Sequence, residues 1–114
     1  MSAPVAGSAI SADDLELLAR LRRGDEAAFT QLVERLHGPM LRLAMVHVGN
    51  RAVAEEVVQD AWVGVLTQLG RFEGRSSLRT WVLRIVANRA GEAARRSVAR
   101  VALICSLRSE TLAS

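Results

Sequence analysis

The sequence has few of the residues that mark extracellular and membrane proteins. Cys105 is the only cysteine among the 114 residues, so the chain cannot form an internal disulfide bond. No apolar run approaches the roughly 20 residues that a membrane-spanning helix needs, and no basic segment followed by a long apolar core marks a signal peptide. These absences predict a cytoplasmic protein that does not contact the membrane.

Residues that favour strands or interrupt helices are also scarce. Aromatic residues make up 4% of the chain, and Gly and Pro do not recur at the spacing of strands and turns. Hydrophobic residues make up 50%, enough for a packed core in a chain of this length. We therefore predict a single all-α domain, a compact bundle of three main helices plus a short N-terminal helix.

The sequence also lacks the groupings that catalysis needs. No nucleophile has a base at a plausible spacing, and no glycine-rich phosphate loop follows a strand. His37 and His47 have no carboxylate or thiol at metal-ligand spacing, and the adjacent Glu55 and Glu56 point about 100° apart on a helix. The chain is therefore predicted to be a binding protein rather than an enzyme, with no metal and no cofactor.

Lysine is absent, and all fifteen basic residues are arginines, which stay charged and can fork onto phosphate or guanine. Their distribution is uneven. Residues 1–60 contain six Arg and nine acidic residues, a net charge of −3, whereas residues 61–114 contain nine Arg and three acidic residues, a net charge of +6. An acidic front and a basic rear suggest two different partners, of which a polyanion suits the rear.

Capping residues and glycines predict where four helices begin and end. The expected N-caps are Ser11, Asp25, Asn50 and either Ser76 or Ser77. The first helix should end at Gly24, the second at Gly49–Asn50 and the third near Leu69. Residues 1–10, small and close to neutral, are expected to be a disordered leader.

Helical spacing predicts which side chains of the first two helices face the core, and two residues should disturb the helices. The inward residues are expected to be Leu15, Leu18, Leu21, Phe29, Leu32, Val33 and Leu36. Proline removes a backbone hydrogen bond and crowds the previous turn, so Gly38–Pro39 predicts a kink or a break. Gly91 costs its helix about 1 kcal/mol relative to Ala, which predicts fraying beyond Ala90 or the close approach of another backbone.

The third predicted helix, from Arg51 to about Leu69, has two unlike faces. Its inner face collects Ala54, Val57, Val58, Ala61, Trp62, Val65 and Leu69. The opposite side carries Glu56, Gln59, Asp60 and Val63. An acidic face can be simply solvated, but a protein-binding strip needs an apolar centre within a polar rim, and Val63 supplies one.

A polar loop, Glu73 to Ser77, precedes the fourth helix. Leu78, Val82, Ile85 and Val86 form the buried stripe of that helix. A second stripe collects Thr80, Arg84, Asn88 and Arg95, with Trp81 at its border. Planar donors on one rigid face suit a surface that holds phosphate and reads base edges. An arginine-rich face can equally be solvent-facing and Trp81 can equally be core, so the pattern alone leaves both interpretations open.

Three motifs in order resemble region 2 of bacterial sigma factors of the sigma-70 family, most closely the extracytoplasmic-function (ECF) group. They are AEEVVQDAW at residues 54–62, FEG at 72–74 and LRTWVLRIVANR at 78–89. The resemblance covers roughly Asp13 to Arg96 and implies the helical fold of region 2 over residues 11–96.

The resemblance also implies partners and roles. The strip of Glu56, Gln59 and Asp60 would dock on the clamp helices of the polymerase β′ subunit, with Val63 added from geometry. The loop and the fourth helix would capture the non-template strand of the promoter minus-ten element and help to open the duplex. The residues assigned to DNA are Phe72, Arg75, Ser76, Ser77, Arg79, Thr80, Arg84, Asn88, Arg89, Arg95 and Arg96. Anti-sigma proteins bind members of this family, which makes such a protein a further candidate partner.

Residues 97–114 depart from the family pattern. Sigma factors of this group carry a second domain, region 4, which reads the minus-thirty-five element, and the residues after Arg96 are too few to form it. This divergent tail could extend the last helix, pack on an exposed groove or be a read-through product. Two alternative functions follow: a sigma remnant that only binds polymerase or an anti-sigma protein, and an unrelated helix-turn-helix regulator of duplex DNA.

Overall fold

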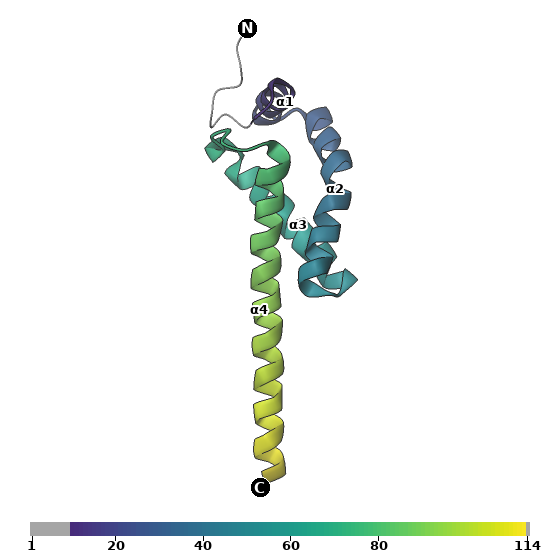
Figure 1. Ribbon diagram of the computed structural model, residues 1–114, viewed down its shortest axis with the longest axis vertical. Helices are drawn as coiled ribbons and strands as arrows, with labels where there is room; N and C mark the ends of the chain where they lie inside the picture. The colour runs from purple at the N-terminus through teal and green to yellow at the C-terminus, as the bar shows by residue number, and fades with distance from the viewer. Residues whose placement is uncertain (1–9, 114) are drawn as a thin grey trace.

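The structure, a computed structural model, describes residues 10–113 and is all-α over that range, as predicted. Its elements are α1 (Ala12–Arg22), α2 (Glu26–Val48), α3 (Arg51–Gln68), the 3₁₀ turn η1 (Leu69–Arg71) and α4 (Leu78–Ala113). Figure 1 shows α2, α3 and the first half of α4 packed side by side, with α1 across one end. The second half of α4 continues beyond the bundle. Nine residues of the predicted leader, 1–9, lie outside the described range. The tenth, Ile10, is half-buried and packs against the core, so the prediction that it is disordered is wrong.

The predicted N-caps are confirmed. Ser11 Oγ accepts a hydrogen bond from the Asp14 N–H at 3.1 Å, and Asn50 Oδ1 accepts one from the Val53 N–H at 3.1 Å. Asp25 Oδ1 caps the first turn of α2 in the same way. Of the two candidates before α4, Ser77 is the cap, because its Oγ accepts from the Thr80 N–H at 3.1 Å. Each cap satisfies a backbone donor that the helix itself cannot satisfy.

The core lies where α2, α3 and α4 meet. Its largest fully buried side chains are Leu32, Leu36, Met40, Val58, Val65, Leu78, Val82 and Val86. The buried stripe of α4 is as predicted. The inner face of α3 is also as predicted except at Trp62, which is only half-buried. Burying one such side chain contributes roughly 1.5–3 kcal/mol, so this three-helix contact is the main source of stability.

The predicted inward face of α1 is partly wrong. Leu18 and Leu21 are buried, but Leu15 is 52% exposed and Leu17 is buried in its place. The buried positions Asp14, Leu17, Leu18 and Leu21 follow the spacing i, i+3, i+4 and i+7 of one helix face. In α2, Phe29 and Val33 are only half-buried, and Ala28 belongs to the core.

The predicted disturbances at Pro39 and Gly91 also need correction. The break is wrong, because α2 runs continuously through Pro39 from Glu26 to Val48. Leu36 and Met40, on either side of the proline, are fully buried, and their packing offsets the lost backbone hydrogen bond. Fraying beyond Ala90 is wrong as well, since α4 continues to Ala113. Among the described residues, no backbone of another element lies within 4 Å of a Cβ added at Gly91, and the nearest atom is Nη1 of Arg95 in the same helix, at 3.6 Å.

The α1–α2 junction is held by an ion pair. Arg20 Nε donates to Asp25 Oδ2 at 2.9 Å, and this hydrogen bond is the largest cause that lowers the pKa of Asp25 below its ordinary value of 3.8. The N-cap bonds from Ala28 and Ala27 act in the same direction.

Over the described residues, no helix is long and apolar enough to cross a membrane.

Candidate nucleic-acid and protein interfaces

The loop between η1 and α4 is anchored by one aromatic pair and exposes its polar residues. Phe72 is buried, and its ring lies 4.7 Å from that of Trp81 at an interplanar angle of 34°. Glu73 and Arg75 form an exposed ion pair of 3.1 Å, and Ser77 Oγ donates to Thr80 Oγ1 at 3.0 Å. The structure therefore places Phe72 beneath the loop, with Glu73 and Arg75 facing solvent. Ser76 is half-buried and donates to the carbonyl of Ser77.

The predicted nucleic-acid face of α4 is exposed. The exposed residues are Arg79, Thr80, Arg84, Asn88, Arg95 and Arg96. Apart from Thr80, none of these side chains forms a hydrogen bond or an ion pair with another described residue. Their guanidinium and amide donors are therefore available to a ligand, and the buried stripe of α4 holds their backbone in place.

The predicted strip on α3 is exposed as well. Glu56, Gln59 and Asp60 are exposed. Val63, which lies between them and the end of the helix, is 61% exposed. One further residue belongs here that the sequence interpretation missed: Leu66, 54% exposed and three positions after Val63. Its i, i+3 spacing from Val63 was the signal that could have found it. The apolar part of the strip is therefore wider than predicted.

Comparison with known proteins assigns the family. The sigma-70 region 2 model matches residues 32–100, which is more than half of the chain. This chain belongs to the sigma-70 region 2 family. The match includes most of α2, all of α3 and the loop, and the bundled half of α4, whereas α1 precedes it.

Three curated relatives agree with this family. The chain is 36% identical over 77 residues to the RNA polymerase sigma-H factor of Pseudomonas aeruginosa, covering 68% of this chain and 40% of the relative. It is 35% identical over 86 residues to the ECF RNA polymerase sigma factor SigM of Mycobacterium tuberculosis, covering 75% and 44%. The ECF RNA polymerase sigma-E factor of Escherichia coli is 35% identical over 77 residues, covering 68% and 40%. The chain thus spans less than half the length of these relatives.

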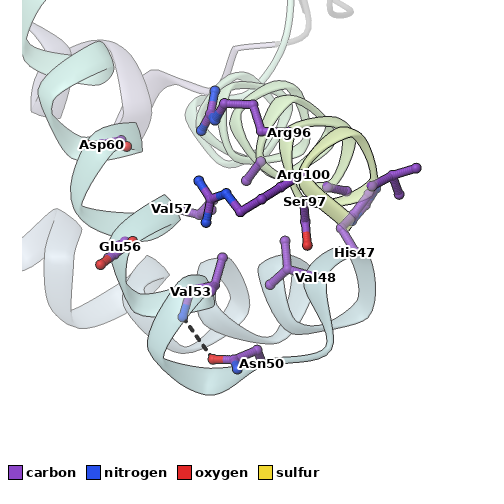
Figure 2. Close-up of a pocket in the computed structure, with 13 residues that line it drawn as sticks. His47, Val48, Asn50, Val53, Glu56, Val57, Asp60, Arg96, Ser97 and Arg100 are labelled. Atoms are coloured by element: carbon purple, nitrogen blue, oxygen red, sulfur yellow. Dashed lines mark hydrogen bonds between the residues drawn. The ribbon is translucent and has the colours of Figure 1, made fainter. Parts of the chain in front are cut away.

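One groove of about 400 Å³ in this region 2 domain is lined by residues of both predicted faces, which therefore lie closer together than expected. Glu56 and Asp60 line it from α3, and Arg96 and Arg100 line it from α4. Figure 2 shows the Arg100 side chain reaching from α4 toward Val57 of α3. No ion pair within 4.0 Å joins these four charged residues. The acidic and basic faces therefore share an edge at Arg96.

Arg89 differs from the other arginines assigned to DNA. It is half-buried, and its Nη2 would lie 2.8 Å from a Cβ added to Gly64 of α3. Ile85 Cγ2 would lie 3.2 Å from the same position. Gly64 therefore lets α3 and α4 approach closely, and Arg89 covers that contact instead of projecting freely like Arg84.

The structure also contains contacts to the loop that the sequence interpretation missed entirely. Asp14 and Arg22 of α1 each hydrogen-bond to the backbone at one end of the loop. They lie about half the chain away from the groups they contact, and no periodic pattern could have paired them. Among the side chains that the structure describes, no three His, Cys, Asp or Glu residues gather as a possible metal site.

Proposed function

We propose that this domain acts in transcription initiation as region 2 of a sigma factor, with two binding faces. Membership of the sigma-70 region 2 family supports a role in transcription initiation. The α3 strip of Glu56, Gln59, Asp60 and Val63 binds the β′ clamp helices of core RNA polymerase. The loop and the arginine face of α4 bind the non-template strand of the minus-ten element. The supporting observation is that both motif-bearing faces are exposed on one rigid bundle.

The α3 strip suits a helical protein partner. Val63 and Leu66 form an exposed apolar centre, and the carboxylates of Glu56 and Asp60 lie at its edge. Buried apolar area at the centre of an interface contributes affinity, whereas rim charges mainly steer association and set specificity. A partner with an apolar ridge and basic side chains beside it would match this strip.

The loop and α4 suit a single strand. Taking a base out of the stack costs a few kcal/mol, which contacts available only to the unpaired strand must offset. The loop between Phe72 and Ser77 offers polar groups beside the packed rings of Phe72 and Trp81, and it is next to the start of α4. Arg84 and Arg95 can hold phosphates, and the Asn88 amide can pair with a base edge.

The polymerase face is tested by capture of a β′ clamp fragment. We expect wild-type protein to be captured, Gln59→Ala to be captured weakly, and Asp60→Arg not to be captured because it reverses a rim charge. Glu34→Arg, which reverses an exposed carboxylate on α2, is the matched control and should behave as wild type. Equal loss for Asp60→Arg and Glu34→Arg would contradict this face.

The DNA face is tested by fluorescence anisotropy with a labelled minus-ten single strand, a scrambled strand and the duplex. We expect a preference for the minus-ten strand and a steep fall of affinity with salt, because phosphate neutralisation releases counterions. Capture by the β′ fragment without strand binding would instead indicate a protein-interaction module. A preference for duplex would indicate a helix-turn-helix type of regulator.

A further inference from the structure

Helix α1 and the residue before its cap contact the loop that joins η1 to α4 at its start, its middle and its end. These contacts come from Arg22, Ile10 and Asp14 respectively. All three lie before residue 32, where the family match begins. Family membership therefore gives them no role.

Arg22 holds the start of the loop. Its Nη2 donates to the Phe72 carbonyl at 2.7 Å and to the Leu69 carbonyl at 3.2 Å, and its Nε lies 3.4 Å from the Leu69 carbonyl. The Leu69 carbonyl also accepts from the Phe72 N–H at 3.4 Å, and carbonyls at the C-terminal end of a helix attract positive charge. A guanidinium that bridges the Leu69 and Phe72 carbonyls therefore sets the direction in which the chain leaves η1.

Asp14 holds the end of the loop. Asp14 is 7% exposed and is the only buried charged or polar residue in the described part of the chain. Its Oδ2 accepts a hydrogen bond from the Leu78 N–H at 3.1 Å. Its Oδ1 lies 3.9 Å from Nη2 of Arg35 on α2. A carboxylate at a helix N-terminus accepts from a free backbone N–H, and its negative charge interacts favourably with the helix dipole. Asp14 thus fixes where α4 begins.

Ile10 touches the middle of the loop. Gly74 has a φ of +76°, and a Cβ added there would lie 3.2 Å from Ile10 Cγ2. Ile10 itself is half-buried against the core. The loop therefore lies against an apolar side chain at the point where its backbone turns in the left-handed region.

We propose that Ile10, Asp14 and Arg22 form a brace that holds the loop in the shape that receives an unstacked base. Asp14 and Arg22 are then positioning residues for strand recognition, although neither contacts the strand. The inference rests on the proposed function of the loop. Its physical basis is preorganisation: a loop ordered during folding does not lose its conformational freedom on binding, so affinity and selectivity both rise.

The test compares two matched pairs of variants. Asp14→Ala removes the acceptor for the Leu78 N–H, whereas Asp14→Asn retains an acceptor oxygen. Arg22→Gln removes the bridging guanidinium, and Arg23→Gln removes an exposed guanidinium that forms no hydrogen bond or ion pair with another described residue. We measure hydrogen exchange of the amides of residues 72–78 in the free protein, affinity for the minus-ten and scrambled strands, and capture by the β′ fragment.

We expect Asp14→Ala and Arg22→Gln to exchange these amides about tenfold faster and to lose about tenfold affinity for the minus-ten strand, as for a lost charge-assisted hydrogen bond. Affinity for the scrambled strand should change much less, and capture by the β′ fragment should persist, which shows that the bundle is intact. Asp14→Asn and Arg23→Gln should stay close to wild type.

Two results would overturn the brace: unchanged exchange in both disruptive variants, or faster exchange with unchanged strand discrimination. If Asp14→Ala also loses the β′ fragment, Arg22→Gln alone decides between these outcomes. Wild-type protein that binds both strands equally would contradict the proposed function itself, and the brace with it.

Discussion

The two halves of α4 have similar apolar residues but different surroundings. In residues 78–96 the helix buries Leu78, Val82 and Val86 against α2 and α3. In residues 97–109 every side chain is exposed. The turn between α2 and α3 ends the bundle, and Figure 1 shows α4 continuing alone past it. Apolar spacing therefore predicts that a helix forms, but not whether another element reaches it.

The difference between the packed and exposed halves of α4 also shows where the proposed DNA contacts lie. All residues assigned to DNA lie between Phe72 and Arg96, on the loop and the packed half of α4. Packing fixes these donors relative to the loop, and a precise arrangement is what reading a base edge requires. The exposed half carries Arg100 and Arg108, and the Arg108 side chain forms no hydrogen bond or ion pair with another described residue.

The largest expected effect separates the two halves by stability. Val82→Ala should lower the free energy of unfolding by about 2 kcal/mol, because it leaves a cavity at a fully buried site. Val98→Ala, the same change at a side chain that is 70% exposed, should stay within about 0.5 kcal/mol of wild type. Urea unfolding midpoints measure both. Similar losses would show that the second half is packed in solution.

The next effect concerns base reading. Asn88→Ala should weaken binding to the preferred minus-ten strand about tenfold, since a good amide–base pair contributes roughly 1–3 kcal/mol of discrimination. Binding to a scrambled strand should weaken less. Ser106→Ala, on the exposed half, serves as the control, and anisotropy titrations provide the affinities. Equal loss on both strands would count against base reading by Asn88.

A smaller effect concerns phosphate. Arg84→Ala should reduce the salt slope of strand binding by about one, as expected for one lost phosphate contact. Arg108→Ala removes the same side chain from the exposed half and should leave the slope unchanged. The measurement is strand affinity at several salt concentrations. A slope that falls equally in both variants would mean that α4 contributes only diffuse charge.

Features set by local chemistry could be predicted from the sequence. Each N-cap depends on a side chain and a backbone N–H within three residues, so Ser11, Asp25 and Asn50 were identifiable. The buried stripe of α4 and the inner face of α3 follow from periodicity. The exposure of the α3 strip and of Arg84, Asn88 and Arg95 on α4 follows from the same periodicity, because these residues occupy the remaining helix faces.

Features set by distant packing could not be predicted. Leu17 replaces Leu15 in the core because α1 turns the face containing Asp14 toward the start of α4. Pro39 does not break α2, because buried neighbours outweigh its local cost. The contact between Arg89 and Gly64 likewise depends on how α3 and α4 cross.

The smallest expected effect lies outside the binding faces and depends on pH. The hydrogen bond from Arg20 lowers the pKa of Asp25 in the folded state below its ordinary value of 3.8. The ionised Asp25 therefore stabilises the fold above pH 3.8, and this contribution is lost as the pH falls through the lower folded-state pKa. Asp25→Ala should therefore lower the melting temperature slightly at pH 7, with a difference from wild type that shrinks on acidification below 3.8. Glu34→Ala, at an exposed carboxylate that pairs with no other described residue, is the control for a nonspecific charge effect.

The most direct test of two separate binding faces reverses one charge on each and measures both ligands. Asp60→Arg and Arg84→Glu are each assayed against the β′ clamp fragment and against the minus-ten single strand. We expect Asp60→Arg to lose the fragment and retain the strand, and Arg84→Glu to lose the strand and retain the fragment. A folded variant that loses both ligands, or that loses only the ligand assigned to the other face, would contradict this division.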